Sequence, residues 1–385
     1  MNFELDAHQR DRQAAFAHAF AGIAARAGLG DPSRDDWRDV VDSGYLGLFH
    51  PAPEGQGAEG IVLALAMDQL ARASASAFWT ATISTLLCGR MLADLCTPQH
   101  VERWLAPIIA GRAIGCFAAT EDAAGSDPGS YRTTLRRGPQ GARLSGKKSR
   151  ISNAGVADVA LVLARLDEPT SPKLAYVVVD LGQAGVRRSE LAKLGLDGMS
   201  WGNLEFDEVT IADQDVIVDA SIEATMRSVE WGQLLQVWSA IGLAEAAIAA
   251  CRAHVREREA FGRPLAQLEL VRDRLAGMRV ELDAARLLAL EATWSKAQDR
   301  PARELVMMAK IHATELAVRI TDAALRIFGG WGYAKASPIE RLHRDSLANV
   351  PAGLPTDRLR ELLVCPRLNV DPWTYAAPDR VLLEP

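Results

Sequence analysis

The feature that most constrains the fold is the order of three hydrophobic patterns along the chain. Residues 10–111 place apolar side chains three and four positions apart, the spacing of a helix with one buried face. Residues 113–211 instead contain short apolar runs between Gly, Pro and Asp turns, which is typical of strands. Helical spacing returns after residue 220. The order predicts a helical layer, then a small antiparallel sheet or barrel, then a second helical part.

The length of the chain favours several packed domains. At 385 residues it exceeds one ordinary core, so two or three domains are expected. The pattern changes place the N-terminal all-α domain at 1–112, the middle β domain at 113–219 and the C-terminal helical domain at 220–385. In the last domain we expect helices at about 221–257, 266–298, 302–328 and 356–364.

Composition narrows the class of partner. The 43 Lys and Arg against 49 Asp and Glu leave a net charge of −6 with no block of like charge, which argues against nucleic-acid or membrane partners. No His or Cys set has metal-ligand spacing, and no run reaches the ~20 apolar residues of a membrane span. The N-terminus has no apolar signal region. We expect a cytoplasmic protein that acts on a small molecule and holds no metal.

Two segments of the middle part combine small residues with hydroxyl groups. The first, FAATEDAAGSDPGSYRTT (117–134), leaves a strand and enters a loop whose backbone N–H groups and Thr120 and Ser126 hydroxyls can face a polar ligand. By itself it is equally an ordinary turn. The second, GKKSRISNAGVADVALVLAR (146–165), carries Ser152 at the end of a strand-like alternation that can aim its hydroxyl at the same ligand.

Two segments of the C-terminal part combine arginine with glycine. REREAFGRPLAQLELVRDRLA (256–276) contains Arg258, whose planar guanidinium suits a pyrophosphate, although an exposed helix-end arginine is the simpler interpretation of this segment alone. IFGGWGY (327–333) places Gly329 and Gly330 where the backbone can approach a ligand closely, and SPIERLHRD (337–345) follows it.

The four segments, in this order, closely resemble the acyl-CoA dehydrogenase family over about residues 10–365. The resemblance implies an α+β fold with an N-terminal helical domain, a middle antiparallel β domain and a C-terminal four-helix-bundle domain. It also implies a bound FAD, with some contacts supplied by a neighbouring subunit, and hence a homodimer or homotetramer. The cofactor-binding positions that it implies are Phe117, Ala119, Thr120, Gly125, Ser126, Arg150, Ser152, Arg258, Phe261, Glu269, Arg326, Gly329, Gly330 and Thr356.

The chain departs from the family pattern at three cofactor positions. Arg150 replaces the aromatic residue that usually stands before the hydroxyl position. Glu269 stands where the family has Gln, which removes an amide donor and adds negative charge. Arg326 also replaces a Gln, and it is compatible with a phosphate contact.

The expected general base is missing. The family removes the α-proton of an acyl thioester with a Glu while the β-hydrogen leaves as hydride to the flavin. Counting from the two flanking motifs places that Glu at Gly353 or Leu354, and the family's other known position falls on Gly232. The nearby carboxylates are Glu230, which points about 200° around the helix from Gly232, and Asp357, which equally suits a helix N-terminus.

These observations leave three functions open. The first is FAD-dependent α,β-dehydrogenation of an acyl-CoA or an acyl-carrier-protein thioester, with electron-transfer flavoprotein or another acceptor taking the electrons. Its expected substrate-binding residues are Ser126, Glu230, Gln233 and Gly353. The second is a non-catalytic subunit of a heteromer whose other chain supplies the Glu. The third is a repurposed member, either a flavin monooxygenase or an enzyme for a non-redox step on an acyl thioester.

Overall fold

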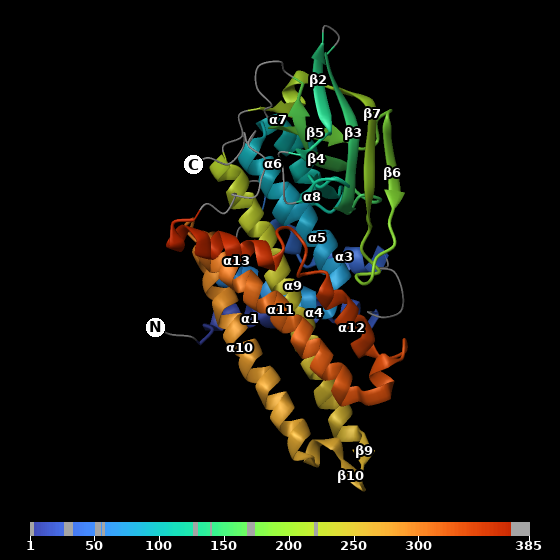
Figure 1. Ribbon diagram of the computed structural model, residues 1–385, viewed down its shortest axis with the longest axis vertical. Coiled ribbons are helices and arrows are strands. Elements are labelled where there is room, and N and C mark those ends of the chain that lie inside the picture. Colours follow the sequence, from blue (N-terminus) through green and yellow to red (C-terminus); the bar gives the residue numbers. More distant parts are fainter. Residues whose placement is uncertain are drawn as a thin grey trace.

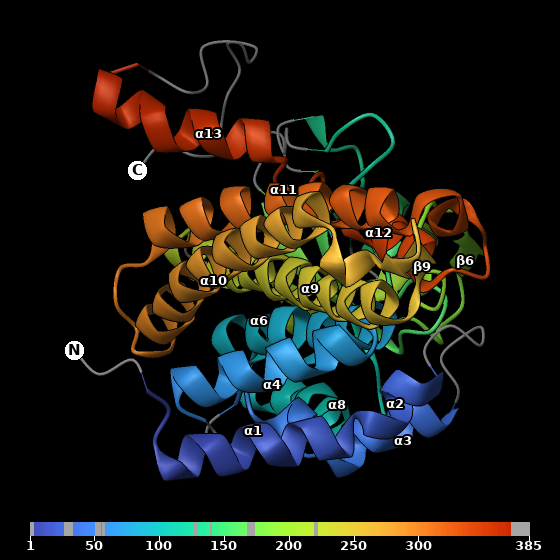
Figure 2. The same cartoon turned by 90° about the horizontal axis from the view of Figure 1, so that it is seen from below.

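The computed structural model describes residues 4–26, 34–50, 55, 58–125, 130–138, 141–167, 174–218 and 222–370. Its N-terminal part is helical, as the periodicity predicts, and Figure 2 shows these helices as one layer against the C-terminal bundle. The helices are α1 (Ala7–Ala19), α2 (Ala21–Arg26), α3 (Arg34–Asp42), α4 (Gly60–Ala73), α5 (Ala75–Thr82), α6 (Arg90–Leu95), α7 (Pro98–His100) and α8 (Ala106–Ile109). Two π-helical segments, Ile83–Gly89 and Val101–Leu105, connect α5 to α6 and α7 to α8.

The middle part forms an eight-stranded sheet with the order β6-β7-β3-β2-β4-β5-β8, and β1 pairs with β4. The strands are β1 (Gly115–Ala118), β2 (Thr134–Gly138), β3 (Gly141–Ser152), β4 (Val159–Leu166), β5 (Leu174–Asp180), β6 (Val186–Glu190), β7 (Trp201–Ile211) and β8 (Val216–Ile217). Most pairs of neighbouring strands are antiparallel, as predicted, but β1 and β2 both pair with β4 in parallel. The sheet is therefore mixed, since β4 has parallel partners in β1 and β2 and an antiparallel partner in β5.

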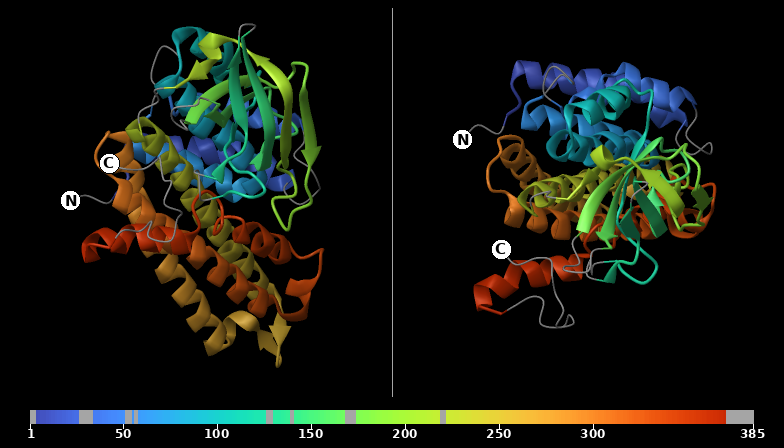
Figure 3. Two further views of the ribbon diagram at one scale, coloured as in Figure 1. Left: turned by 45° about the horizontal axis from the view of Figure 1, so that its top comes forward. Right: turned by 90° about the horizontal axis from the view of Figure 1, so that it is seen from above.

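Alternate residues of β4 pack into two different hydrophobic cores, one shared with the N-terminal helices and one inside the sheet domain. Val159 and Leu161 pack with N-terminal residues such as Met91 and Ile108, whereas Ala160, Val162 and Ala164 pack inside the sheet domain. A strand covered on both faces needs apolar residues at every position, which explains the continuous run VALVL. The sheet is thereby attached to the flank of the N-terminal helices, an arrangement that Figure 3 shows from two sides.

The C-terminal part consists of α9 (Ile222–Glu257), α10 (Glu269–Ala297), α11 (Arg303–Phe328), α12 (Pro338–Leu347) and α13 (Thr356–Val364). The bounds of α9, α11 and α13 match the predicted helices to within one residue, whereas α12 was not predicted. Helix α10 begins three residues after its predicted start, because Leu265–Gln267 form a separate 3-10 turn that follows a small hairpin of β9 (Glu259–Ala260) and β10 (Arg263–Pro264). Pro264 is the last residue of β10 and directly precedes the helical turn Leu265–Gln267. Figure 1 shows the hairpin at the end of the bundle farthest from the sheet.

Helix α9 is the central element of the molecule. The segment Arg227–Glu257 is long and apolar enough to cross a membrane by composition alone. However, 78% of its most apolar 18-residue stretch is buried inside the protein, as in the core helix of a folded domain. Two indole N–H groups form hydrogen bonds between α9 and the neighbouring helices α5 and α10. Trp79 of α5 donates to Ser239 at 2.8 Å, and Trp238 of α9 donates to Thr293 of α10 at 2.9 Å.

The crossing of α4 and α9 depends on a glycine. A Cβ atom at Gly242 of α9 would lie 2.5 Å from the Ala71 Cβ and 2.7 Å from the Ala71 carbonyl carbon of α4, closer than such atoms approach. We expect Gly242→Ala to lower the free energy of unfolding by about 1–3 kcal/mol, because the two helices must move apart. Chemical denaturation measures this change.

Gly277 of α10 is the matched control, because a Cβ atom there would meet nothing within 4 Å. Gly277→Ala should raise the free energy of unfolding by up to about 1 kcal/mol, since alanine has the higher helix propensity. Equal effects of the two substitutions would contradict the tight crossing.

Candidate functional site

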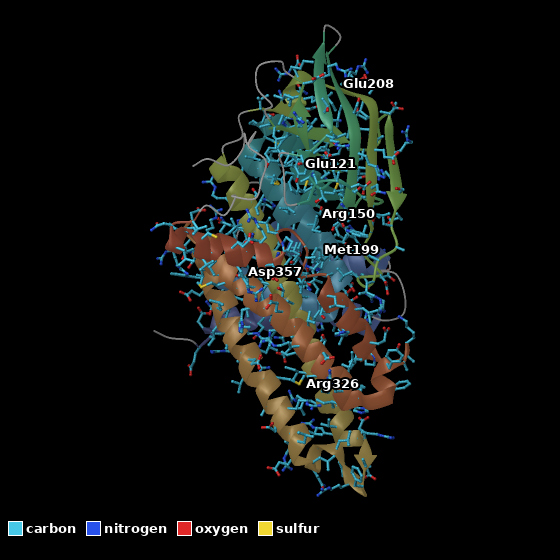
Figure 4. The ribbon with its side chains drawn as sticks, viewed as in Figure 1. Glu121, Arg150, Met199, Glu208, Arg326 and Asp357 are labelled. Carbon is cyan, nitrogen blue, oxygen red and sulfur yellow. The ribbon has the colours of Figure 1, made fainter. Side chains whose placement is uncertain are left out.

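The predicted cofactor residues fall into two separate groups. Figure 4 shows Arg150 at the end of the sheet that faces the bundle, together with Met199, whereas Arg326 lies much farther down the bundle. The first group contains Phe117, Ala119, Thr120, Gly125, Arg150 and Ser152; Ser126 lies outside the described residues. The second contains Arg258, Phe261, Glu269, Arg326, Gly329 and Gly330. One chain does not bring the two groups together.

A buried ion pair shapes the loop of the first group. The Lys148 side chain is fully buried, and its Nζ atom lies 2.8 Å from both Glu121 Oε1 and the Ala119 carbonyl oxygen. Glu121 also accepts hydrogen bonds from the backbone N–H groups of Arg132 (2.7 Å) and Thr133 (2.9 Å). Burial lowers the pKa of Lys148 to about 8, although its bond to Glu121 opposes the shift. The loop after β1 is thus held from inside by paired charges.

Two hydroxyl groups of the first group are free to bind a ligand. Thr120 and Ser152 are both half-buried, and neither hydroxyl is hydrogen-bonded within the part of the chain that the structure describes. They belong to adjacent segments, because the backbone N–H of Ser149 donates to the Thr120 carbonyl oxygen at 2.9 Å. Half-buried hydroxyls without partners suit the polar edge of a planar ring system such as the expected flavin.

The other members of the first group frame this position. Phe117 is half-buried beside Tyr176, with ring centroids 6.3 Å apart. The Gly125 carbonyl oxygen accepts a hydrogen bond from Tyr131 at 3.2 Å. Arg150 has a left-handed backbone with φ +59°, and its guanidinium donates to the Glu121 carbonyl oxygen at 2.7 Å. The arginine that replaces the family's aromatic residue is thus bonded to the loop.

The second group lies exposed at the far end of the bundle. His254 of α9 stacks on Phe328 of α11 with ring centroids 4.1 Å apart, and this contact places the segment after α9 beside the segment after α11. Phe261 is 91% exposed with a left-handed backbone. Arg326 is exposed and lies 2.8 Å from Asp322, which raises the pKa of Arg326.

The remaining members of this group are also exposed. Glu269 is the first residue of α10, and Cβ atoms at Gly329 and Gly330 would meet nothing within 4 Å. The seventh predicted position of the C-terminal domain, Thr356, is instead buried at the start of α13. An exposed apolar side chain in a strained conformation is typical of a surface that another molecule covers.

Different side chains occupy the space at two of the alternative base positions. A Cβ atom at Gly353 would lie 3.0 Å from Gln236 Nε2, and Gly353 has φ +62°. Gln236 follows Gly232 by four residues on α9, so both face the same side of the helix. Leu87 lies in front of Gly232, 3.4 Å from where its Cβ atom would be. The space beside Gly353 therefore holds Gln236, an amide that cannot act as a base, and the space in front of Gly232 holds Leu87.

The two substitute carboxylates have different surroundings. Glu230 lies 2.5 Å from Lys296 of α10 in a largely buried ion pair, and it also lines the small cleft that contains Gln233 and Leu354. Asp357 is 99% exposed, and its nearest charged partner is Arg360 at 3.5 Å.

Gln233 lies in a small cleft of about 20 Å³ between α9, α11 and the segment around α13. Its lining residues are Val229, Glu230, Gln233, Arg303, Met307, Leu354, Leu359 and Leu362. This volume is enough for about one water molecule. A wider groove of about 360 Å³ lies between α10, α11 and α13, but it contains none of the predicted site residues.

A buried lysine fixes the loop around Gly353. Lys310 of α11 is fully buried, and its Nζ atom lies 2.5 Å from the Ala352 carbonyl oxygen and also donates to the Leu354 carbonyl oxygen. These two acceptors flank Gly353. Burial lowers the pKa of Lys310 to about 7. A neutral amine still has two N–H groups, one for each carbonyl.

Gln236 and Lys310 are the site residues that the sequence analysis missed. The spacing of four residues between Gly232 and Gln236 is a signal that the sequence contains. Lys310 appears as a lone charge in the apolar face of a predicted helix, but its acceptors lie 42 and 44 positions away and could not be inferred from it.

Comparison with known proteins gives one consistent result. Models of the acyl-CoA dehydrogenase N-terminal, middle and C-terminal domains match residues 8–112, 116–209 and 222–362. The chain is 31% identical to the mitochondrial short-chain specific acyl-CoA dehydrogenase of Bos taurus over 86% of this chain and 82% of that protein.

Solved structures confirm the expected fold. Butyryl-CoA dehydrogenase from Megasphaera elsdenii superimposes with a TM-score of 0.89 at 24% identity, covering 96% of this chain and 100% of the other. A protein described as an FAD-dependent dehydrogenase gives a TM-score of 0.86 at 25% identity, with coverages of 96% and 100%.

Titration of Lys310 predicts a pH dependence of stability. Below pH 7 the lysine is charged in both the folded and the unfolded chain, whereas between pH 7 and its unfolded pKa of 10.5 only the unfolded chain binds the proton. The free energy of unfolding therefore rises with pH in this window, by at most about 1.4 kcal/mol per pH unit. Denaturation of the wild type and Lys310→Met should show a difference that grows from pH 7 upward.

Lys335 provides the control, because its side chain is 81% exposed. The difference between the wild type and Lys335→Met should stay nearly constant over the same pH range. A pH-independent difference for Lys310→Met would show that Lys310 keeps its ordinary pKa.

Proposed function

We propose, since this chain belongs to the acyl-CoA dehydrogenase family, that it is an FAD-dependent oxidoreductase that removes hydrogen across the Cα–Cβ bond of an acyl thioester. The observation that carries the proposal is the pair of free, half-buried hydroxyls of Thr120 and Ser152. They project from a loop and a strand that the Lys148–Glu121 pair holds in place. Preorganised hydroxyls can orient a flavin without rearrangement.

FAD, when bound, accepts the β-hydrogen of the substrate as a hydride. The residues of this chain orient the reacting groups and exclude water. Thr120 and Ser152 hold the polar edge of the ring, and Arg150 adds a positive charge to the same loop. Lys310 fixes the backbone on both sides of Gly353, where the acyl group is expected.

Removal of the α-proton is the step that the described residues do not assist. General-base catalysis contributes about 10²–10⁴-fold, and no carboxylate stands at Gly353, Leu354 or Gly232. The proton must then pass to water or hydroxide. A thioester deuterated at Cα should therefore react with a large primary isotope effect, and the rate should rise with pH.

The missing carboxylate also favours a second function, that of a partner subunit in a heteromer. The other chain would then supply the base, and this chain would contribute cofactor contacts from its exposed second group. Phe261, which is 91% exposed, is the feature of that group that most clearly requires a covering surface. In the primary proposal a second copy of this chain covers it, which gives a homodimer or homotetramer.

One experiment tests both functions. The chain is purified alone, its flavin spectrum and mass in solution are recorded, and bound FAD is mixed anaerobically with a panel of acyl thioesters. Slow bleaching by a thioester supports the dehydrogenase. An oligomer that binds FAD but is never bleached supports the partner subunit, and absence of FAD binding contradicts both.

Restoring a carboxylate should restore the base. We expect Leu354→Glu to increase the rate of flavin reduction by about 10²-fold or more. Gly353→Glu should give a smaller gain, because φ +62° strains a residue with a side chain and its Cβ atom would press on Gln236. Stopped-flow absorbance of the flavin measures the rates.

Leu354→Gln is the control, because it has nearly the same shape as Leu354→Glu but cannot accept the proton. Equal rates for the two variants would mean that a carboxylate at position 354 does not remove the α-proton, and the assignment of this position as that of the missing base would be wrong.

A further inference from the structure

Two buried amide groups of α9 lack partners. Gln233 is 5% exposed and Gln236 is 6% exposed, and the Oε1 atom of each is buried without a hydrogen-bond partner. Buried amides are nearly always hydrogen-bonded, because an unsatisfied polar group away from water costs free energy. Turning either amide about its last bond exchanges oxygen and nitrogen but leaves a polar atom unpaired.

The position of the pair connects it to the substrate. Gln236 touches Gly353 and shares a helix face with Gly232, the positions from which the family reaches the α-carbon. Gln233 lies three residues earlier, so the two side chains are neighbours on the helix. It also lines the cleft beside Leu354. The two amides therefore border the place where the acyl group of the proposed substrate must lie.

The charged residues around Gln233 and Gln236 determine whether a charged or a neutral substituent of the acyl group can bind there. Lys296 is already paired with Glu230, and Lys310 is already bonded to two backbone carbonyls. Neither lysine is therefore a free counter-charge for a group at Gln236. Arg303 is the remaining cation among the residues that line the cleft, and its side chain is exposed. An ionised substituent between the amides and the two buried lysines would lack compensation, whereas a neutral one needs only the amide hydrogen bonds.

We infer that the substrate is a thioester whose acyl group carries a neutral hydrogen-bonding substituent, a hydroxyl or an amide, which Gln236 and Gln233 bind. The inference rests on the proposed function and adds a substrate class to it. A plain hydrocarbon chain leaves both amides unsatisfied, and the site discriminates against it for that reason.

Matched thioesters test the inference by binding, without turnover. Isothermal titration of the FAD-loaded protein compares 3-hydroxybutyryl-CoA with 3-methylbutyryl-CoA and 4-hydroxybutyryl-CoA with pentanoyl-CoA, pairs in which a hydroxyl replaces a methyl group. Succinyl-CoA is the charged probe. We expect one hydroxyl compound to bind about 10- to 100-fold more tightly than its methyl partner, and succinyl-CoA to bind more weakly than that compound.

Substitution of the amides identifies their role. Gln236→Met keeps the approximate volume and removes the unsatisfied group, so the protein should fold at least as stably and lose the preference for the hydroxyl compound. Gln233→Met is the second variant and should reduce the same preference. Gln298→Met is the control, since Gln298 is exposed at the end of α10, and it should leave the preference unchanged.

The outcomes separate the two proposals. If the methyl compounds bind as tightly as the hydroxyl compounds in the wild type, or if the preference survives in both amide variants, the inference is overturned while the dehydrogenase proposal stands. If no thioester binds to the FAD-loaded protein, both are overturned.

Discussion

The burial of the middle of α9 on every side is the constraint on which the rest of the structure depends. Residues 231–244 of this helix are all buried, and α4, α5, α10, α11 and α12 pack against the helix. The close approach at Gly242 brings the N-terminal layer against it, and the Trp238–Thr293 bond attaches α10. Any polar group on such a helix is costly, which makes its glutamines informative.

The buried polar groups near the candidate site fall into two sets, those with hydrogen-bond partners and those without. Lys148 with Glu121 and Lys310 with two carbonyls are bonded, and each pair fixes a loop at the candidate site. Gln233 and Gln236 are not bonded through Oε1, although they are equally buried. Bonded groups shape the site, while unbonded ones remain available to a ligand. This difference separates the supporting residues from those that we assign to substrate binding.

The family, the α+β fold and most helix bounds could be predicted from the sequence, and the comparisons confirm the family and fold. Periodicity is a local property, so α9 and α11 were predicted to within a residue or two. The hairpin before α10 and the parallel pairing of β1 with β4 were missed, because they depend on which segments meet in space. The roles assigned to individual site residues remain predictions.

The sequence by itself determined that no carboxylate stands at Gly353, Leu354 or Gly232, the positions at which the family resemblance places the base. Only the tertiary structure decided what stands in its place. Gln236 meets Gly353 across 117 positions of the chain, and Lys310 holds the same loop from α11. Residue identity limits the chemistry that a position can perform, whereas the packing of distant segments decides which groups share one buried space and which of them are left without a partner.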